Sequence, residues 1–164
     1  MNLYIKLFGG ALIMLSALLV GREYSKFVDK RIAELLGFLS LIEHARGEIS
    51  SYLAFGGGLF ARFENEALEK CGFLPLLREG CEACDALDRS SASLSLSASQ
   101  RKDLRDFFSR FGSEYIEAEI EKTTAFLEKF KKDLEREREN LTKSLSIARA
   151  LLLGGALWAG IMAV

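Results

Sequence analysis

The sequence contains very little proline, histidine or tryptophan. Its 164 residues include one proline, Pro75, one histidine, His44, and one tryptophan. β-Branched residues are scarce, and no stretch alternates between apolar and polar residues as a half-buried strand would. Leu, Ala, Glu, Lys and Arg predominate instead, a composition that is typical of helices. These features argue against a β-rich fold and predict an all-α fold.

An excess of charge of one sign is also missing. Lys and Arg together number 22, and Asp and Glu together number 23. Because a basic excess is the electrostatic signature of nucleic-acid-binding domains, we expect no nucleic-acid partner. Hydrophobic residues make up 49% of the chain, but they are unevenly placed. Both ends are apolar, and the middle carries nearly all the charge.

Cysteine is too rare to form a disulfide framework. The three thiols, Cys71, Cys81 and Cys84, are an odd number. Cys81 and Cys84 have the spacing of a redox pair or of half a zinc site. A thioredoxin-like motif needs a βαβ context, however, and a structural zinc site needs two more ligands. We expect the pair to contribute to an apolar helix face with Leu77, and a thiol redox or metal protein using Cys81 and Cys84 is the less favoured alternative.

Other combinations of residues that support catalysis are missing as well. No nucleophile–base pair, metal-ligand set or pair of acidic residues has a suitable spacing, and His44 lies among charged residues without a partner motif. The glycines of Ala54–Gly58 lack the Gly-Lys-Ser/Thr ending of a phosphate-binding loop. They are more typical of a flexible turn between helices or of a mobile partner-binding loop. We therefore expect no enzyme activity, no cofactor and no small-molecule substrate.

The sequence does contain two apolar runs, one at each end. Leu7–Gly21 has no charge, and as a helix its roughly 15 residues span about 22 Å, short of a ~30 Å hydrocarbon core. Lys6 can extend along the membrane surface, and Leu3–Ile5 lengthen the apolar run. We expect a retained membrane helix, with a cleaved signal peptide or a buried core helix as alternatives. At the other end, no charge follows Arg149, and this run predicts a second membrane segment.

The flanking charges predict the topology of this membrane hairpin. Basic residues flank the inner ends of both runs: Arg22, Lys26, Lys30, Arg31, Lys143 and Arg149. The positive-inside rule then places residues 22–148 in the cytoplasm and both termini outside it. We expect three parts: an N-terminal transmembrane helix (1–21), a cytosolic helical domain (22–148) and a C-terminal transmembrane segment (149–164). Gly10, Gly154 and Gly155 provide small surfaces on which the membrane helices can pack closely.

A long helix from Ser113 to Val164 is the main feature of the C-terminal third. Apolar residues follow one face of it at heptad spacing: Ile116, Ile120, Leu127, Phe130, Leu134 and Leu141. Glu137 interrupts this helix seam. Both the long helix and the first cytosolic helix, Asp29–Leu53, leave the membrane, so we expect them to pack antiparallel as a stalk.

Shorter helices are expected between these two. Leu59–Cys71 is one, with Gly72 just beyond its end, and Pro75 opens a second that runs to about Leu87. The Ser-rich stretch Asp88–Ser99 predicts an irregular linker. Ser97 and Gln100 have the spacing of a capping box, so a helix should start near Ala98 and end at Gly112. On the first cytosolic helix, Glu34 is expected on the polar face.

In order, spacing and total length, these features resemble one bacterial family. The residues that carry the resemblance are Gly10–Ile13, Ser16 and Gly21 near the start, Leu39, Ile42, Glu43, Glu48 and Ile49, then Phe111-Gly112, and finally Gly154-Gly155. With them the chain resembles the stage III sporulation protein AB of endospore-forming bacteria. The cytosolic domain of that family is similar to the helical domains of type II secretion inner-membrane platform proteins.

The resemblance implies a non-enzymatic scaffold of the mother-cell-to-forespore channel. It further implies a location in the mother-cell membrane around the forespore. The implied partners are a secretion-type ATPase and other membrane proteins of the sporulation channel. From the residues alone, a generic helical-bundle protein that binds partner helices is the alternative.

Overall fold

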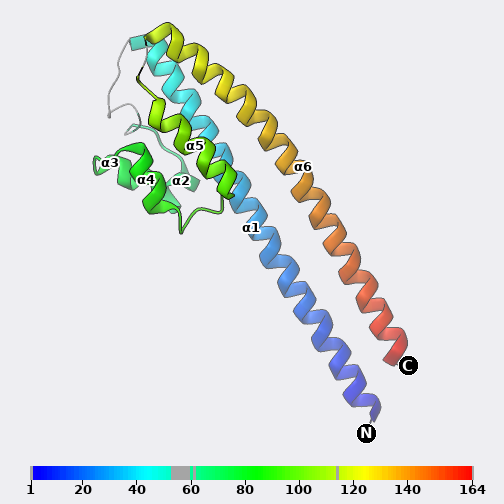
Figure 1. The fold of residues 1–164 in the computed structure, drawn as a ribbon. Coiled ribbons are helices and arrows are strands. Elements are labelled where there is room, and N and C mark those ends of the chain that lie inside the picture. The colour runs from blue at the N-terminus through cyan, green and yellow to red at the C-terminus, as the bar shows by residue number, and fades with distance from the viewer. Residues whose placement is uncertain (1, 53–59, 61, 114, 164) are drawn as a thin grey trace. The chain divides into compact units, whose positions relative to one another are not determined.

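The computed structural model of the chain confirms the all-α prediction. It describes residues 2–52, 60, 62–113 and 115–163, and for parts of both terminal helices it describes the backbone alone. These residues form helices without strands (Figure 1). The helices are α1 (Asn2–Tyr52), α2 (Glu66–Lys70), α3 (Phe73–Arg78), α4 (Ala83–Ser90), α5 (Ala98–Arg110) and α6 (Ile116–Ala163). The predicted turn at Ala54–Gly58 lies outside the described residues.

The chain divides into two compact units. Unit 1 contains the two ends, Met1–Asp29 and Arg136–Val164, and unit 2 contains Lys30–Glu135. The boundary on α6 lies beside Glu137, the residue that interrupts the predicted seam. The predicted domain boundaries at 21/22 and 148/149 concern a membrane, and they stay a prediction.

Unit 2 is built around one hydrophobic core to which every helix contributes. Its most deeply buried apolar side chains are at most 1% exposed: Leu35, Phe38, Leu41, Ile42, Leu68, Phe73, Leu74, Leu87 and Leu104. From α6, the core receives Leu127, Phe130 and Leu134. Helix α2 has only five residues, and it depends on this packing because so short a helix is unstable alone.

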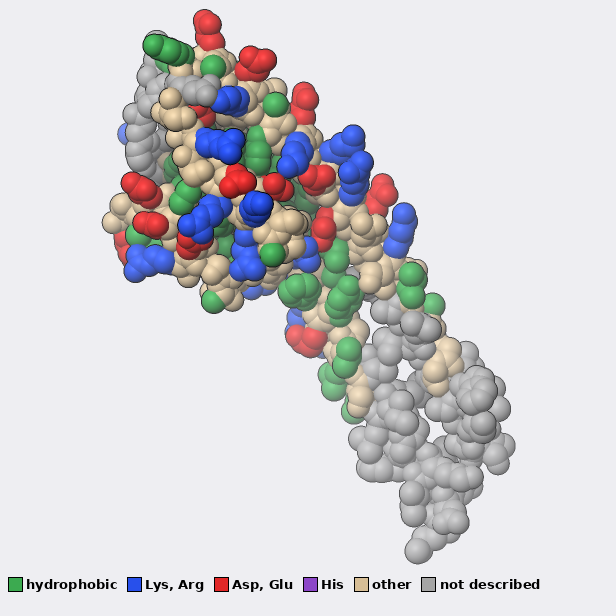
Figure 2. Space-filling view, viewed as in Figure 1, with side chains coloured by type: hydrophobic (Ala, Val, Ile, Leu, Met, Phe, Trp, Pro, Cys, Tyr) green, Lys and Arg blue, Asp and Glu red, His purple; other side chains and the backbone are tan. Residues whose placement is uncertain are grey.

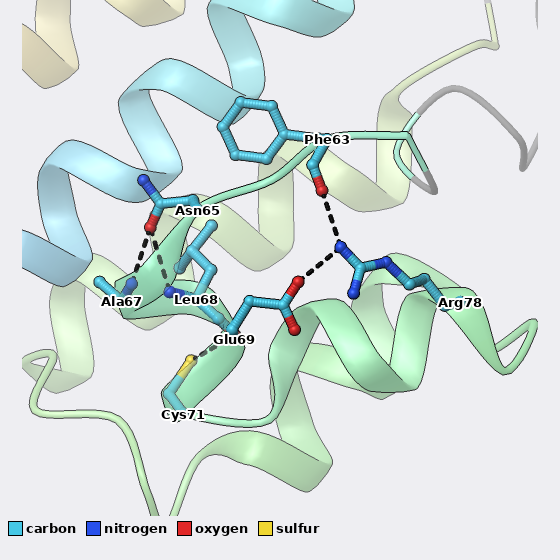
Figure 3. A network of polar contacts seen from close by, with 7 residues as sticks. All are labelled: Phe63, Asn65, Ala67, Leu68, Glu69, Cys71 and Arg78. Atoms are coloured by element: carbon cyan, nitrogen blue, oxygen red, sulfur yellow. Dashed lines mark hydrogen bonds and ion pairs between the residues drawn. The ribbon is translucent and has the colours of Figure 1, made fainter.

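Helix α2 begins later than the sequence predicts. The expected helix Leu59–Cys71 is wrong at the described residues 60 and 62–65, because these are not helical and α2 begins after Asn65. The Asn65 side chain accepts the backbone N–H groups of Ala67 and Leu68, both at 3.1 Å, and so caps the helix (Figure 3). The end is as predicted, because Gly72 has a left-handed φ of 85° just after the C-cap.

The single helix expected from Pro75 to Leu87 is wrong too. It is divided into α3, which begins before Pro75, and α4, which begins at Ala83. Gly80 has a φ of 89° between them, a conformation that favours glycine and ends α3. The predicted helix start at Ala98 is confirmed, together with the capping box of Ser97 and Gln100.

The Ser-rich segment after α4 is more ordered than a linker. Helix α4 extends to Ser90, and Leu94 and Leu96 are buried in the core of unit 2. Its serines gave the segment the composition of a linker, but these two leucines fix it against the other helices.

Helices α1 and α6 run antiparallel within each unit. In unit 2, Lys131 pairs with Glu43 at 2.6 Å, and the Arg46 guanidinium donates to the Thr124 hydroxyl at 3.5 Å. In unit 1, the hydroxyls of Tyr24 and Ser144 are 3.2 Å apart. Figure 1 shows the N-terminal end of α1 and the C-terminal end of α6 at the same end of unit 1. Antiparallel packing of the two long helices was the sequence prediction.

The helix seam faces inward over most of its length. Leu127, Phe130, Leu134 and Leu141 are at most 9% exposed, and Ile116 and Ile120 at the start of α6 are half-buried. Thr123 lies on the same face and is fully buried.

Both predicted membrane segments are helical, as the first part of α1 and the last part of α6. Within the part of the chain that the structure describes, no helix offers an apolar stretch long enough to cross a membrane. The surroundings of Gly10 lie outside the described residues, and Gly154 and Gly155 are exposed.

Candidate partner-binding site

A hollow of about 520 Å³ opens on the surface of unit 2 where α3, α4 and α5 meet. Three phenylalanines, two cysteines and a leucine provide most of its lining, with a few polar groups among them: Phe60, Leu77, Cys81, Glu82, Ala83, Cys84, Phe108, Ser109, Phe111 and Gly112. Its size lies within the range of ligand-binding pockets, and its surface is polar and apolar in nearly equal parts.

Aromatic contacts hold the apolar wall in place. The Phe60 ring lies 5.9 Å from Phe108 and 5.5 Å from Phe111, measured between ring centroids. Phe107 continues the cluster toward α6, where it stacks on Phe126 at 4.5 Å. Edge-to-face and offset stacked pairs of this kind add about 0.5–1.5 kcal/mol each beyond the burial of their area. The wall is therefore formed before any partner binds.

The two cysteines of the hollow are half-buried free thiols. The expected helix face shared with Leu77 is wrong, because Leu77 lies on α3, Cys84 on α4 and Cys81 between the two helices. Both thiols nevertheless pack against the core to which Leu77 belongs. The Arg89 guanidinium donates to Cys81 Sγ at 3.2 Å, and the Cys84 thiol donates to the Arg105 carbonyl at 3.7 Å. Burial raises the pKa of the Cys84 thiol, which disfavours the reactive thiolate. No group of side chains suited to a metal ion occurs among the described residues.

Exposed carboxylates surround the cysteines along the chain. From Glu79 to Asp88 the sequence contains four acidic residues and no Lys or Arg. Asp88 is paired with Arg105 at 2.8 Å. The other three, Glu79, Glu82 and Asp85, are exposed. The hollow thus combines aromatic and aliphatic side chains in its wall with the Glu82 carboxylate, and Glu79 and Asp85 add an acidic margin along the adjoining chain.

A polar network fixes α3, which carries Leu77 into the hollow. The Arg78 guanidinium donates to the Phe63 carbonyl at 3.2 Å and pairs with the Glu69 carboxylate (Figure 3). These contacts join α3 to α2 and to the segment before it. They orient one wall of the hollow without occupying it.

Glu34 corrects a further expectation from the sequence. It was assigned to the polar face of α1, but its side chain is 1% exposed. Its Oε2 accepts the backbone N–H of Ser95 at 2.6 Å, and Lys30 Nζ lies 3.7 Å from Oε1. Burial raises the pKa of this carboxyl group despite both contacts. Glu34 therefore tethers the segment after α4 to α1.

His44 has a packing contact and no catalytic arrangement around it among the described residues. It is half-buried on α1, and its ring lies 5.5 Å from that of Phe63. This position fits the structural role expected of a lone histidine.

Comparison with known families decides the membership of the chain. The family model described as stage III sporulation protein AB matches residues 6–163. The chain belongs to the stage III sporulation protein AB family. Neither the curated proteins nor the solved structures that were compared with the chain gave a significant match.

In this family member, the sequence indicates parts of the hollow but not the hollow itself. Phe107, Phe108 and Phe111 belong to the helix predicted from Ala98 to Gly112, and the cysteines were expected on another helix. A usable signal was the run of acidic residues beside the cysteines, because an apolar face bounded by charge of one sign is typical of a binding surface.

Proposed function

We propose that the chain is a non-enzymatic, membrane-anchored scaffold of the mother-cell-to-forespore channel. Unit 2 lies in the mother-cell cytoplasm, where it couples a secretion-type ATPase to the membrane proteins of the channel. The two apolar ends of the chain anchor it in the mother-cell membrane around the forespore. The family match over residues 6–163 is the observation that carries this proposal.

The structure of unit 1 supports a paired anchor. Both apolar ends of the chain belong to this one unit, as antiparallel parts of α1 and α6. Large apolar side chains are exposed there on α1 near its apolar end, with Leu15 and Leu19 each 56% and Val20 67% exposed. Figure 2 shows hydrophobic side chains on the described surface of unit 1. On α6, Ile147 is 60% exposed. Apolar side chains gathered on a helix surface in this way suit contact with lipid.

The charge of the neighbouring residues supports the orientation. Arg22 and Lys26 follow the exposed apolar residues on α1 and are exposed themselves. On α6, Lys143 is exposed shortly before the apolar end. Basic residues at these positions favour a cytoplasmic location for the adjoining part of the chain.

The surface of unit 2 supports a scaffolding role. Its visible face carries charged side chains of both signs (Figure 2). The hollow between α3, α4 and α5 is a preformed concave surface on this unit, and its thiols are engaged in contacts within the protein. A binding surface on one unit and apolar ends on the other suit an adaptor between a cytosolic protein and a membrane.

Two measurements on the full chain test the anchor. Washing membranes with alkaline carbonate should leave the chain in the pellet, and a reporter active only in the cytosol should be silent when fused after Val164. The same reporter inserted between the exposed residues Ala92 and Ser93 should be active, which controls for expression. Release by carbonate would favour the alternative of a soluble helical bundle, and an active reporter after Val164 would contradict the topology.

A further inference from the structure

We propose that the hollow on unit 2 binds a short basic segment of a partner protein that carries a large apolar side chain. The apolar side chain enters between Phe60, Phe108 and Phe111, and flanking Lys or Arg residues meet the acidic margin. This inference rests on the proposed function, because it identifies the kind of protein segment that the scaffold holds.

The interior of the hollow determines the apolar part of the partner. Leu77 and Phe108 are each 7% exposed and Phe60 is 9% exposed, so the floor is formed by side chains already packed in the core. Phe111 is less buried and stands at the margin. A volume of about 520 Å³ leaves room for one or two large side chains of a bound segment. An aromatic or branched aliphatic side chain gains most from such a site, as binding hot spots do.

The margin of the hollow determines the charge of the partner. Glu82 lines the hollow itself, and Glu79 and Asp85 are its acidic neighbours in sequence. No ion pair engages these three carboxylates within the described part of the chain. Of the nearby basic groups, Arg105 pairs with Asp88 and Arg89 contacts Cys81, whereas Arg110 is exposed on α5 beside the lining residues Ser109 and Phe111. Glu79, Glu82 and Asp85 outnumber this one guanidinium, so complementary charge on the partner is positive, which speeds association and rejects acidic segments.

The same features select a protein segment over other ligands. A nucleic acid or an anionic lipid would bring negative charge to an acidic margin. The exposed apolar residues of unit 1, which suit lipid, are on other parts of the chain. A basic peptide with an apolar anchor satisfies both the interior and the margin.

Binding of a defined probe tests the proposal. The probe is a fluorescent peptide, Lys-Lys-Leu-Phe-Lys-Lys, titrated with the full chain in uncharged detergent micelles, and binding to empty micelles is subtracted. Peptides with glutamates in place of the lysines, or serines in place of Leu-Phe, serve as comparisons. Fluorescence anisotropy should show binding of the basic apolar peptide only, and this binding should weaken in high salt because exposed charge pairs are screened.

Two variants localise the binding. Ser109→Trp introduces a large ring into the hollow from an exposed position on α5, and it should weaken binding about tenfold. Lys102→Trp on an exposed part of the same helix lies outside the lining and should bind as the wild type does. Glu82→Lys should weaken binding about threefold, and the exposed Glu64→Lys should leave it unchanged.

Circular dichroism melts confirm that each variant is folded, so a loss of binding cannot be ascribed to unfolding. Binding of the acidic peptide, absence of binding to the wild type, or equal binding by Ser109→Trp would each overturn the proposal. Carbonate retention and reporter topology do not depend on the hollow. Their failure would instead count against the membrane scaffold, so the two proposals can fail separately.

Discussion

The carboxylate of Glu34 accepts the backbone N–H of Ser95 at 2.6 Å. Lys30, one turn before Glu34 on α1, strengthens this link because its Nζ also donates to the Ser93 carbonyl at 2.8 Å. A buried acid thus connects α1 to the segment between α4 and α5, and that segment brings Leu94 and Leu96 into the core. Because the bond ends on a backbone group, it fixes the path of the chain as well as a side chain.

The link should leave a signature in the pH dependence of stability. Because the folded-state pKa of Glu34 is raised above the ordinary value of 4.5, the native state holds this proton more tightly than the unfolded state. The contribution of Glu34 to the free energy of unfolding is then largest below the ordinary pKa and decreases as pH rises through the raised value. Glu34→Gln should remove this decrease. Denaturant unfolding at a series of pH values measures it, with the exposed Glu135→Gln as the matched control. Identical pH profiles for Glu34→Gln and wild type would show that Glu34 does not titrate differently on folding.

Two glycines of α1 should respond oppositely to the same substitution. A Cβ on Gly37 would lie 2.8 Å from Asn65 Oδ1 and 2.9 Å from Leu68 Cγ, whereas a Cβ on Gly47 would meet nothing within 4 Å. Gly37→Ala should therefore destabilise unit 2 by about 1–3 kcal/mol, because it displaces the side chain that caps α2. Gly47→Ala should stabilise the helix by about 0.5–1 kcal/mol. Thermal unfolding of both variants gives the comparison, and destabilisation by Gly47→Ala would contradict the open surface around that residue.

The helix seam should be sensitive to charge. Leu134 is 9% exposed and belongs to the core of unit 2, so Leu134→Asp buries a charge and should cost roughly 3 kcal/mol or more. Lys132→Asp, exposed on the same helix, should change stability by less than about 0.5 kcal/mol. Denaturant unfolding separates the two. Unchanged stability of Leu134→Asp, with unchanged assembly of the channel, would mean that the seam is solvated.

The cysteines of the hollow should be dispensable for chemistry. The double variant Cys81→Ser with Cys84→Ser should keep sporulation efficiency close to that of the wild type, because the thiols act by packing. Cys71→Ser should destabilise unit 2 by about 1–3 kcal/mol, since that side chain is 4% exposed and packed in the core. Stoichiometric zinc in the purified chain would restore the metal alternative.

The parts of the fold that follow from local chemistry could be predicted from the sequence. The capping box of Ser97 and Gln100 and the left-handed Gly72 depend on a few neighbouring residues, and both were recognised. The heptad spacing on α6 predicted which face is buried, because a helix repeats its faces at a fixed period.

The parts that depend on distant contacts could not be predicted. Nothing near Glu34 in the sequence indicates that the Ser95 backbone will meet it. The break at Gly80 was missed because a single glycine is compatible with a continuous helix. The hollow was missed because its lining residues are distant in sequence. Phe60, Leu77 and Phe108 come from three separate segments that only the packing of unit 2 brings together.

The most direct test of the scaffold is recruitment of the ATPase to a membrane that contains this chain. The purified chain is reconstituted into liposomes, mixed with the secretion-type ATPase from the same organism, and floated on a density gradient. The proposed function predicts that the ATPase floats with liposomes that hold the chain and stays at the bottom with empty liposomes. An ATPase that stays at the bottom in both cases would contradict the coupling of the ATPase to the membrane by this chain.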